Sequence, residues 1–447
     1  MYEEVPIGRR GLGEHRLHVG DEVIAQLRTL AAPLQGARLL NLSLTPFGTV
    51  VSDLLHSVVP LLRDLGLDAD WQVVHASGQF GSFSTLIYEA LCGRHVDWTS
   101  GHAEDWLRFS RATAKPFDSH YDFVLLHDPQ LVGIPAALPN LEARASHWVW
   151  HCHLDLRNAR PEIWESVLPS LKAFDLCVFS DRYFGPPCME GVPALVIPPC
   201  IDPTTARNIE LPELTIRQLL GQHGIDLDRP LLVQAGPLDS AFNPFGAIDV
   251  YRQTKASRGD IQLALVDTMA GDSMEACSRF ERVARHAGND PDIHILVSQR
   301  DDAQLLVNAA QQAATVVLQR SVPAGFALPV WEAQWKGRPV VVGAAGGLPS
   351  QIVDGATGYL AGHNSGFVQA ILDLVDNRER GDRLGRAGHQ LVRERHLLTR
   401  FVADVLRLLR ALRAAPSMRP ETLRPPASAA PPVPAPPVEA GSPGRSR

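Results

Sequence analysis

Long apolar runs are missing from this chain. No stretch of about 18 consecutive apolar residues occurs, so the sequence predicts no transmembrane helix. The opening residues, MYEEVPIGRR, also lack the apolar core of a secretory signal. We therefore expect a cytoplasmic protein that has no membrane partner.

Cysteine is scarce, with six residues in a chain of 447, and no pair has the Cys-x-x-Cys spacing. That spacing is typical of zinc and redox sites, whereas dense cysteines are typical of small secreted domains. The sequence therefore predicts buried free thiols in a reducing compartment rather than disulfides. The six are Cys92, Cys152, Cys177, Cys188, Cys200 and Cys277.

An excess of positive charge is missing as well. The 49 acidic residues outnumber the 42 lysines and arginines, which leaves a formal net charge of −7. Nucleic-acid binding proteins usually carry a basic patch or a basic domain, so we expect no nucleic-acid partner. A small neutral substrate is compatible with this charge balance.

What the chain does contain is a repeated alternation of short apolar segments and helical patterns. Residues 50–65 place Val51, Leu54, Leu55, Val58 and Val59 near the helical period. Alternating strands and helices are typical of α/β domains with parallel sheets. Buried strands are predicted at residues 37–44, 70–75, 121–127, 146–152, 176–180, 194–197, 231–235, 261–266, 293–297, 314–318 and 339–343.

The alternation occurs twice, which predicts two Rossmann-like domains. We place the first domain at residues 1–210, the second at 211–395 and a C-terminal helix at 396–413. Ten of the 35 prolines lie in the last 32 residues, within a Pro/Ala-rich segment. Such a segment buries too little apolar surface to fold, so a disordered tail is predicted at 414–447.

One stretch suggests where a ligand binds: residues 321–352 read SVPAGFALPVWEAQWKGRPVVVGAAGGLPSQI. A helix expected at 328–335, between two strands, makes this a βαβ crossover in a parallel sheet. In such sheets ligands bind at the carboxyl ends of the strands, beside helix N-termini. Glu332 is the acid nearest that edge, and Gly346–Gly347 form a turn that a ligand can approach.

The same stretch resembles the donor-site signature of retaining GT-B glycosyltransferases of family four, and more narrowly the trehalose synthases. Further matching pieces occur in the same order at residues 56–71, 127–130, 148–156, 198–203, 246–252 and 262–270. The resemblance implies a GT-B fold with an interdomain cleft. It also implies hexose transfer, with retention, from a nucleotide-diphosphate sugar to a second sugar. No cofactor and no obligatory metal is implied, and a homodimer is compatible with the resemblance.

The chain departs from the family pattern at positions that would bind the donor. Of two glutamates eight positions apart, for sugar hydroxyls and ribose, the first is replaced by Ala324 and the second is kept as Glu332. An arginine and a lysine that bind the diphosphate fall on Pro237 and Phe242. The glycine-rich loop of the first domain keeps only Gly48 of its three glycines.

Other family positions are retained, mostly on the acceptor side. His153 and Asp155 match a His-Ile-Asp segment that borders the reacting sugar, and they are the candidate catalytic residues. A histidine can donate a hydrogen bond to a sugar hydroxyl, and a carboxylate can accept one. The candidate nucleotide-sugar contacts are Glu332, Gly48, Gly346 and Gly347. A purely structural role stays open for each of these residues.

No metal site is predicted. In the segment His151-Cys152-His153, successive strand side chains point to opposite faces, so the three cannot converge. His127 and Asp128 match a family segment near the cleft, and a structural role for them is favoured over a functional one.

Three functions therefore remain open. The chain is an active trehalose-forming glycosyltransferase, a pseudo-glycosyltransferase that couples an unusual sugar or cyclitol, or a non-catalytic sugar-binding or regulatory protein. Two lost charge-assisted hydrogen bonds at Pro237 and Phe242 weaken donor binding by about 3–6 kcal/mol, or roughly 10²–10⁴-fold. This favours weak or changed activity, unless Arg252 or Lys255 substitutes for the missing cations.

Overall fold

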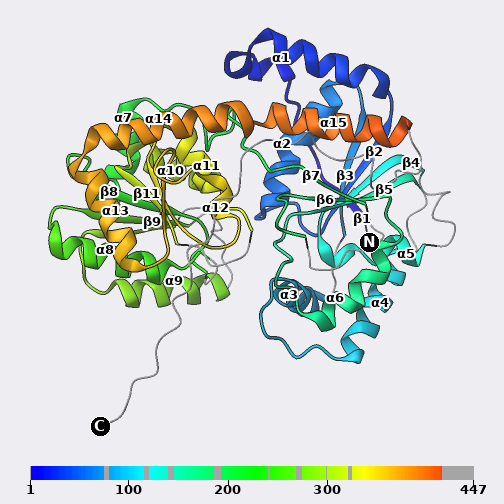
Figure 1. Ribbon diagram of the computed structural model, residues 1–447, viewed down its shortest axis with the longest axis horizontal. Coiled ribbons are helices and arrows are strands. Elements are labelled where there is room, and N and C mark those ends of the chain that lie inside the picture. Colours follow the sequence, from blue (N-terminus) through cyan, green and yellow to red (C-terminus); the bar gives the residue numbers. More distant parts are fainter. Residues whose placement is uncertain are drawn as a thin grey trace, which may run out of the picture.

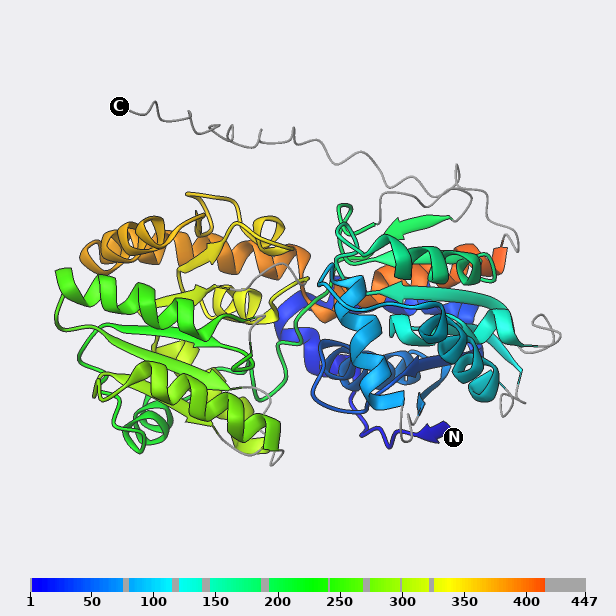
Figure 2. The same cartoon turned by 90° about the horizontal axis from the view of Figure 1, so that it is seen from below.

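The computed structural model describes residues 2–74, 80–114, 120–138, 145–185, 193–239, 242–267, 274–297, 300–320 and 325–414. These residues form two α/β units that lie side by side (Figure 1). In the turned view of Figure 2, helices cover both faces of each sheet. Among the helices that the structure describes, none combines the length and apolar character needed to cross a bilayer.

The first unit contains a seven-stranded sheet in the order β1-β3-β2-β4-β5-β6-β7, with β1 antiparallel to β3 and the other pairs parallel. The strands are β1 (Tyr2–Glu4), β2 (Arg38–Ser43), β3 (Asp68–Val74), β4 (Tyr121–Leu126), β5 (Ala145–Cys152), β6 (Leu176–Phe179) and β7 (Ala194–Val196). Because the chain runs outward from β2 to β3 and then returns to β4, the topological switch point lies between β2 and β4.

The second unit contains a six-stranded parallel sheet in the order β10-β9-β8-β11-β12-β13. The strands are β8 (Leu231–Ala235), β9 (Gln262–Asp267), β10 (Ile293–Val297), β11 (Val316–Gln319), β12 (Val340–Gly343) and β13 (Tyr359–Ala361). The switch point here lies between β8 and β11.

Helices of both units pack their apolar sides against these sheets, as the burial of α2 shows: Val51, Leu55, Val58 and Val59 are all buried. The helices are α1 (Arg16–Ala31), α2 (Val50–Asp64), α3 (Phe80–Leu91), α4 (Ser100–Ala114), α5 (Ile134–Ala137), α6 (Pro161–Leu171), α7 (Glu213–Gly221), α8 (Pro244–Ser257), α9 (Met274–Ala287), α10 (Arg300–Ala313), α11 (Leu328–Trp335), α12 (Leu348–Gln351), α13 (Asn364–Asp376), α14 (Arg378–Arg395) and α15 (Leu398–Ala414).

The last two helices bridge the units. Helix α14 covers the second unit, and α15 returns to the first, where it packs against α1 and α2 (Figure 1). A backbone bridge between Ile201 and Leu397 joins this crossing to the earlier linker. Arg400 adds hydrogen bonds of 2.8 Å to the carbonyl oxygens of Pro198 and Pro199. Two chain crossings, tied together, thus set the position of one unit relative to the other.

The predicted fold class of two Rossmann-like units is confirmed, and a strand is present at every predicted position. Prediction missed β1 and β13, which are three residues long and too short to show a pattern. Buried free thiols are confirmed for three cysteines, but Cys277 is exposed because it lies on the solvent side of α9. Cys188 and residues 415–447, almost all of the predicted tail, lie outside the described residues.

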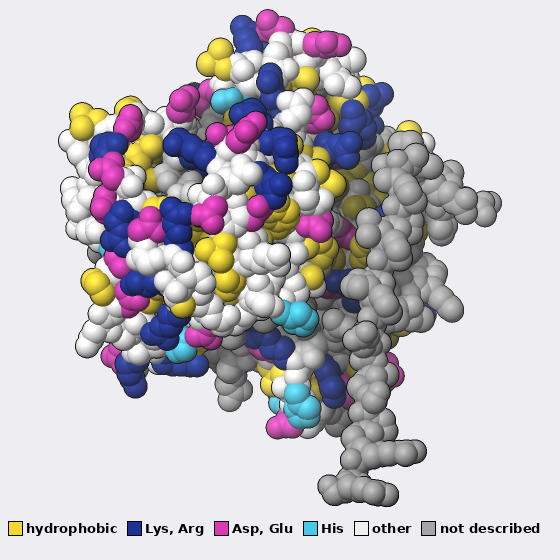
Figure 3. Space-filling model, turned by 60° about the vertical axis from the view of Figure 1, so that its left-hand side comes forward, with side chains coloured by type: hydrophobic (Ala, Val, Ile, Leu, Met, Phe, Trp, Pro, Cys, Tyr) yellow, Lys and Arg dark blue, Asp and Glu magenta, His cyan; other side chains and the backbone are white. Residues whose placement is uncertain are grey.

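Acidic and basic side chains are intermingled over the face of the molecule that Figure 3 shows. Neighbouring charges of opposite sign offset one another within roughly one Debye length, about 8 Å at physiological salt. This face therefore presents mixed charge rather than a field of one sign.

Candidate functional site

The carboxyl end of β2 leads into α2 through a turn that requires glycine. Gly48 has a φ of +79°, and a Cβ at this position would meet no atom within 4 Å. Backbone conformation, rather than space, therefore explains this glycine. Thr49 then caps α2, because its hydroxyl accepts the N–H of Ser52 at 3.1 Å. A contact between Gly48 and a ligand stays a prediction.

Two side chains at the end of β4 link it to neighbouring strands. A carboxylate oxygen of Asp128 accepts the N–H of Leu44 at 2.6 Å, and burial raises the pKa of Asp128 to about 6. His127 places Nε2 3.1 Å from Asn41 Oδ1 and Nδ1 3.2 Å from His153 Nε2. The switch point of the first sheet is therefore cross-linked by buried polar groups.

His153 and Asp155 follow β5 at the same edge. Desolvation lowers the pKa of His153 to about 4, so the ring is neutral at pH 7 and offers one donor and one acceptor nitrogen. Asp155 is 5% exposed, and its Oδ2 accepts a hydrogen bond from Arg157 Nη2 at 2.6 Å. Arg157 also donates to the carbonyl oxygen of Gly346 at 3.3 Å. Asp155 thus positions an arginine that contacts the second unit.

The glycine turn between β12 and α12 also lies at this contact. The N–H of Gly347 donates to the carbonyl oxygen of Gly325 at 3.0 Å. A Cβ on Gly347 would lie 2.9 Å from both that oxygen and the ring of Phe184 in the first unit. The close approach at Gly347 is therefore between two parts of the protein, whereas we predicted the approach of a ligand.

Glu332 of α11 lies in an ion-pair network that joins the units. It is 3% exposed, and its Oε1 lies 3.0 Å from Arg207 Nε. Arg207 Nη1 lies 3.5 Å from Oδ2 of Asp53, in the first turn of α2. The other carboxylate oxygen, Oε2, is buried and has no hydrogen-bond partner among the described residues. Glu332 therefore keeps one acceptor for a ligand hydroxyl.

Lys336, one turn after Glu332, fastens α11 to the linker between the units. Its Nζ donates to Asn208 Oδ1 at 3.1 Å, to Gln311 Oε1 at 2.9 Å and to the carbonyl oxygen of Glu332 at 3.1 Å. Burial lowers the pKa of Lys336 to about 7. In the charged form all three ammonium protons are used by these contacts, so this lysine has no donor left for a ligand.

The turn after β8 is filled by an aromatic ring. Gly236 has a φ of +145°, and a Cβ there would lie 2.2 Å from Cδ1 of Phe242. Gln234 Nε2 donates to the carbonyl oxygen of Phe242 at 2.9 Å and fixes the loop. An apolar ring thus lies in the turn where the sequence predicted the loss of two cations, and that loss stays a prediction. Ala324 lies outside the described residues.

The two bases that the sequence offered as substitutes are engaged elsewhere. Arg252 Nη2 donates to the carbonyl oxygens of His286 and Ala287 at 2.7 and 3.0 Å. Lys255 Nζ lies 2.6 Å from Asp290 and 2.8 Å from Asp292. These partners lie at the end of α9 and in the loop that leads to β10, at the amino edge of the sheet. The proposed substitution by either base is therefore wrong.

A different cation, Arg320, directly follows β11 at the switch point. Its N–H donates to Gln234 Oε1 at 3.1 Å, and its Nη2 donates to Asn364 Oδ1 at 2.9 Å. The guanidinium lies 4.6 Å from the ring centre of Phe367. Burial lowers the pKa of Arg320, but a guanidinium stays charged at pH 7. Its Nε is buried without a partner among the described residues, so one donor remains for a ligand.

Sequence reasoning missed Arg157, Arg207 and Arg320. Arg320 carried a usable signal, because it stands directly after a predicted strand at the edge where ligands bind. Arg207 carried none, because it lies in a polar linker and meets Glu332 only after the two units come together. The prediction that the donor site lacks cations took neither Arg207 nor Arg320 into account.

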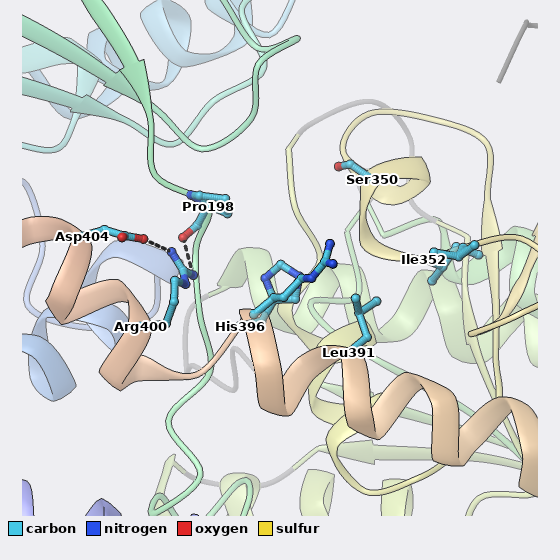
Figure 4. Close-up of a pocket in the computed structure, with 9 residues that line it drawn as sticks. Pro198, Ser350, Ile352, Leu391, His396, Arg400 and Asp404 are labelled. Atoms are coloured by element: carbon cyan, nitrogen blue, oxygen red, sulfur yellow. Dashed lines mark hydrogen bonds and ion pairs between the residues drawn. The ribbon is translucent and has the colours of Figure 1, made fainter. Parts of the chain in front are cut away.

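A surface pocket of about 330 Å³ lies where α14 meets α15 (Figure 4). Arg400 forms an ion pair with Asp404 and donates to Pro198 across it. None of the predicted site residues lines this pocket, which belongs to the helix crossing.

Acidification is expected to destabilise the protein through the three histidines at the ends of β4 and β5. Burial lowers the pKa values of His127, His151 and His153. Between pH 7.5 and 5.5 the unfolded chain therefore binds protons that the folded chain does not. Each group then removes up to roughly 1.4 kcal/mol of unfolding free energy. Asp128, whose pKa is raised to about 6, offsets part of this loss. Urea unfolding at pH 7.5, 6.5 and 5.5 measures the slope.

The variant His151→Phe tests the assignment, because a phenyl ring can keep the stacking on Phe401, whose ring centre is 5.7 Å away. In this variant the unfolding free energy should depend less on pH, because the contribution of one histidine is removed. A slope equal to that of the parent protein would contradict the assignment.

Comparison with known proteins matches both halves of the chain. Residues 41–186 match the family described as "Trehalose synthase, N-terminal domain", and residues 216–391 match "Glycosyl transferases group 1". The trehalose synthase of Pyrococcus horikoshii is 34% identical over 416 residues, which cover 92% of this chain and 99% of that protein. The trehalose synthase of Rubrobacter xylanophilus is 33% identical over 418 residues, with the same shares covered.

Solved structures give the fold. An α,α-trehalose-phosphate synthase (UDP-forming) from Burkholderia xenovorans, in complex with glucose-6-phosphate, superposes with a TM-score of 0.67 at 14% identity. The match covers 84% of this chain and all of that one. Two Rossmann-like units joined in this way define the class of GT-B glycosyltransferases. Within this class, the chain belongs to the trehalose synthase family, because its identity to those proteins extends over nearly their whole length.

Proposed function

We propose that the chain is a hexosyltransferase whose use of the nucleotide-sugar donor is weak or changed relative to trehalose synthases. The acceptor sugar binds beside His153, and the donor lies at the carboxyl edge of β8 and β11. The observation that carries the proposal is the ring of Phe242, which fills the turn where the family pattern has phosphate-binding cations.

The chemistry of transfer explains why this turn matters. In a front-face transfer the acceptor hydroxyl bonds to the anomeric carbon as the diphosphate departs, and its proton passes to the departing oxygen. Negative charge grows on the diphosphate, so fixed cations nearby lower the barrier. In this chain Arg320, whose Nε has no hydrogen-bond partner among the described residues, supplies that charge. One cation replaces two, which supports reduced rather than absent donor binding.

The second candidate function is a protein that no longer transfers glucose from a nucleotide sugar. It is either a non-catalytic sugar-binding protein or a pseudo-glycosyltransferase that couples an unusual sugar or cyclitol. The ion pair between Glu332 and Arg207 favours it, because the acid that would hold a donor ribose already has a counter-charge. Calorimetry with UDP-, ADP- and GDP-glucose, followed by a transfer assay with glucose, separates the two. Donor binding with transfer supports the proposal; sugar binding without transfer supports the second candidate, and no binding of either kind contradicts both.

Replacing Arg320 with alanine is expected to weaken the binding of the preferred nucleotide sugar by roughly 10–150-fold. The reason is that one charge-assisted hydrogen bond contributes about 1.5–3 kcal/mol. Isothermal titration at matched ionic strength measures the change, and a thermal melt checks that the variant is folded. Arg285→Ala is the control, because Arg285 pairs with Glu281 on the exposed side of α9. Equal affinities for the two variants would remove Arg320 from the donor site.

A further inference from the structure

Three histidines converge at the carboxyl edge of the first sheet. His127 directly follows β4. His151 lies near the end of β5 and His153 directly follows it, so these two side chains, two residues apart, lie on the same side of the chain. One ring nitrogen from each lies within 4.8 Å of the others. Cys152 lies on the opposite face of β5 from His151, as the sequence predicted. The third histidine, His127, comes from the end of the neighbouring strand, which the sequence analysis did not consider.

The surroundings of His127 fix its tautomer. Asn41 Nδ2 donates to the carbonyl oxygen of Asp70 at 3.2 Å, which leaves Asn41 Oδ1 facing His127 Nε2 at 3.1 Å. An amide oxygen only accepts, so Nε2 carries the proton and Nδ1 presents a lone pair to the cluster. Metal-bound histidines are oriented in the same way, by a carbonyl or carboxylate acceptor behind the ring.

The other two rings also present nitrogens to the cluster. His153 Nε2 lies 3.2 Å from His127 Nδ1, while its Nδ1 lies 3.4 Å from Ser180 Oγ. His151 is 2% exposed, and its Nε2 is buried without a hydrogen-bond partner among the described residues. A buried unpartnered nitrogen costs free energy, which a ligand would recover. Desolvation lowers all three pKa values, so the rings are neutral and able to coordinate.

We propose that His127, His151 and His153 form a three-imidazole site for a divalent transition metal, with zinc as the ion bound. Zinc–nitrogen bonds of about 2.0–2.1 Å in a tetrahedron place ligand nitrogens about 3.3 Å apart. The 3.2 Å between His127 and His153 already fits this spacing, and His151 needs a shift of about 1.5 Å at most. Imidazole ligands favour zinc, copper and nickel over magnesium or calcium.

Three protein ligands leave a fourth position open. His127 and His151 are buried, whereas His153 is partly exposed and its backbone lies beside Gly325 of the second unit. Because His153 is the least buried of the three, we place the open position on its side of the cluster, where a water or a sugar hydroxyl completes the tetrahedron. The metal would brace β4 against β5. This inference depends on the cluster alone, so the proposed hexosyltransferase function stands or falls separately.

Metal binding to the full chain tests the site without any activity assay. After chelation and dialysis, we expect calorimetry with zinc to show one equivalent bound and the melting temperature to rise. With cobalt(II) as the probe, we expect the intense visible bands of four-coordination. Absence of saturable binding, or the weak bands of six-coordination, would overturn the proposal.

Two variants assign the ligands. His151→Phe should weaken zinc binding by more than the roughly 10–100-fold that loss of an orienting partner costs. His147→Phe is the matched control: His147 lies on the same strand, is buried and stacks on Phe123 outside the cluster. If His151→Phe does not fold, His153→Gln serves in its place, because the side chain of His153 is partly exposed. Unchanged affinity in the cluster variant, or an equal loss in the control, would overturn the site.

Discussion

Replacing Arg207 with alanine is expected to lower the free energy of unfolding by about 3–5 kcal/mol. Arg207 lies 3.0 Å from the carboxylate of Glu332, which is 3% exposed, and 3.5 Å from Asp53 of the other unit. Without the guanidinium, the carboxylate of Glu332 loses its paired arginine while it stays buried away from water. Urea unfolding at pH 7.5, followed by circular dichroism, measures the loss.

The matched control for this change is Arg217→Ala. Arg217 pairs with Glu213 at 3.0 Å on an exposed helix face, and such a pair contributes roughly 0–1 kcal/mol. The double variant Arg207→Met with Glu332→Gln should recover part of the stability, because it leaves no buried charge unpaired. If Arg207→Ala costs no more than the control, the interdomain ion pair does not stabilise the fold.

Restoring the three family residues together is expected to raise affinity for nucleotide-diphosphate glucose by roughly 10²–10⁴-fold. The changes are Pro237→Arg, Phe242→Lys and Ala324→Glu. The two new cations each add about 1.5–3 kcal/mol of charge-assisted hydrogen bonding to the diphosphate. Removal of the Phe242 ring also clears the space over Gly236, where the side chain now lies. Calorimetry with UDP-, ADP- and GDP-glucose measures the gain.

The control must open the turn without adding charge. Pro237→Ala with Phe242→Leu reduces the bulk near Gly236 and adds no charge to the loop. A similar gain in this variant would show that the ring blocks the donor and that missing charge is unimportant. No gain in the restored variant, with its fold intact, would disprove the weakened-donor proposal.

The fold was predictable because its determinants are local. Apolar runs such as residues 121–127 and 231–235 can be buried only in the middle of a parallel sheet, and the helical period of α2 marks the face that covers it. The strand–helix–strand pattern of residues 314–343 also places Glu332 and Gly346 near a carboxyl edge. Strands β1 and β13 were not predicted, because three residues are too few to show an alternation of apolar and polar side chains.

The candidate site was predictable only as a set of positions. Most of these residues follow strands at the carboxyl edges of the two sheets, namely Gly48, His153, Asp155, Gly346 and Gly347, whereas Glu332 lies within α11. Their partners were not predictable. Arg157 reaches Gly346 across 189 positions, and Arg207 reaches Glu332 from a linker without pattern.

By itself, then, the sequence determined two parallel-sheet units and the carboxyl edges at which ligands are expected, whereas the loss of two cations after β8 stays a prediction. Tertiary structure alone decided how the remaining charges are used: Arg320 lies at the carboxyl edge of β11, Arg207 pairs with Glu332, and three histidines meet at the ends of β4 and β5. The physical reason is range. Burial and helical period act on neighbours in the chain, whereas ion pairs and shared ligands depend on distances in space that form only when the two units fold and join.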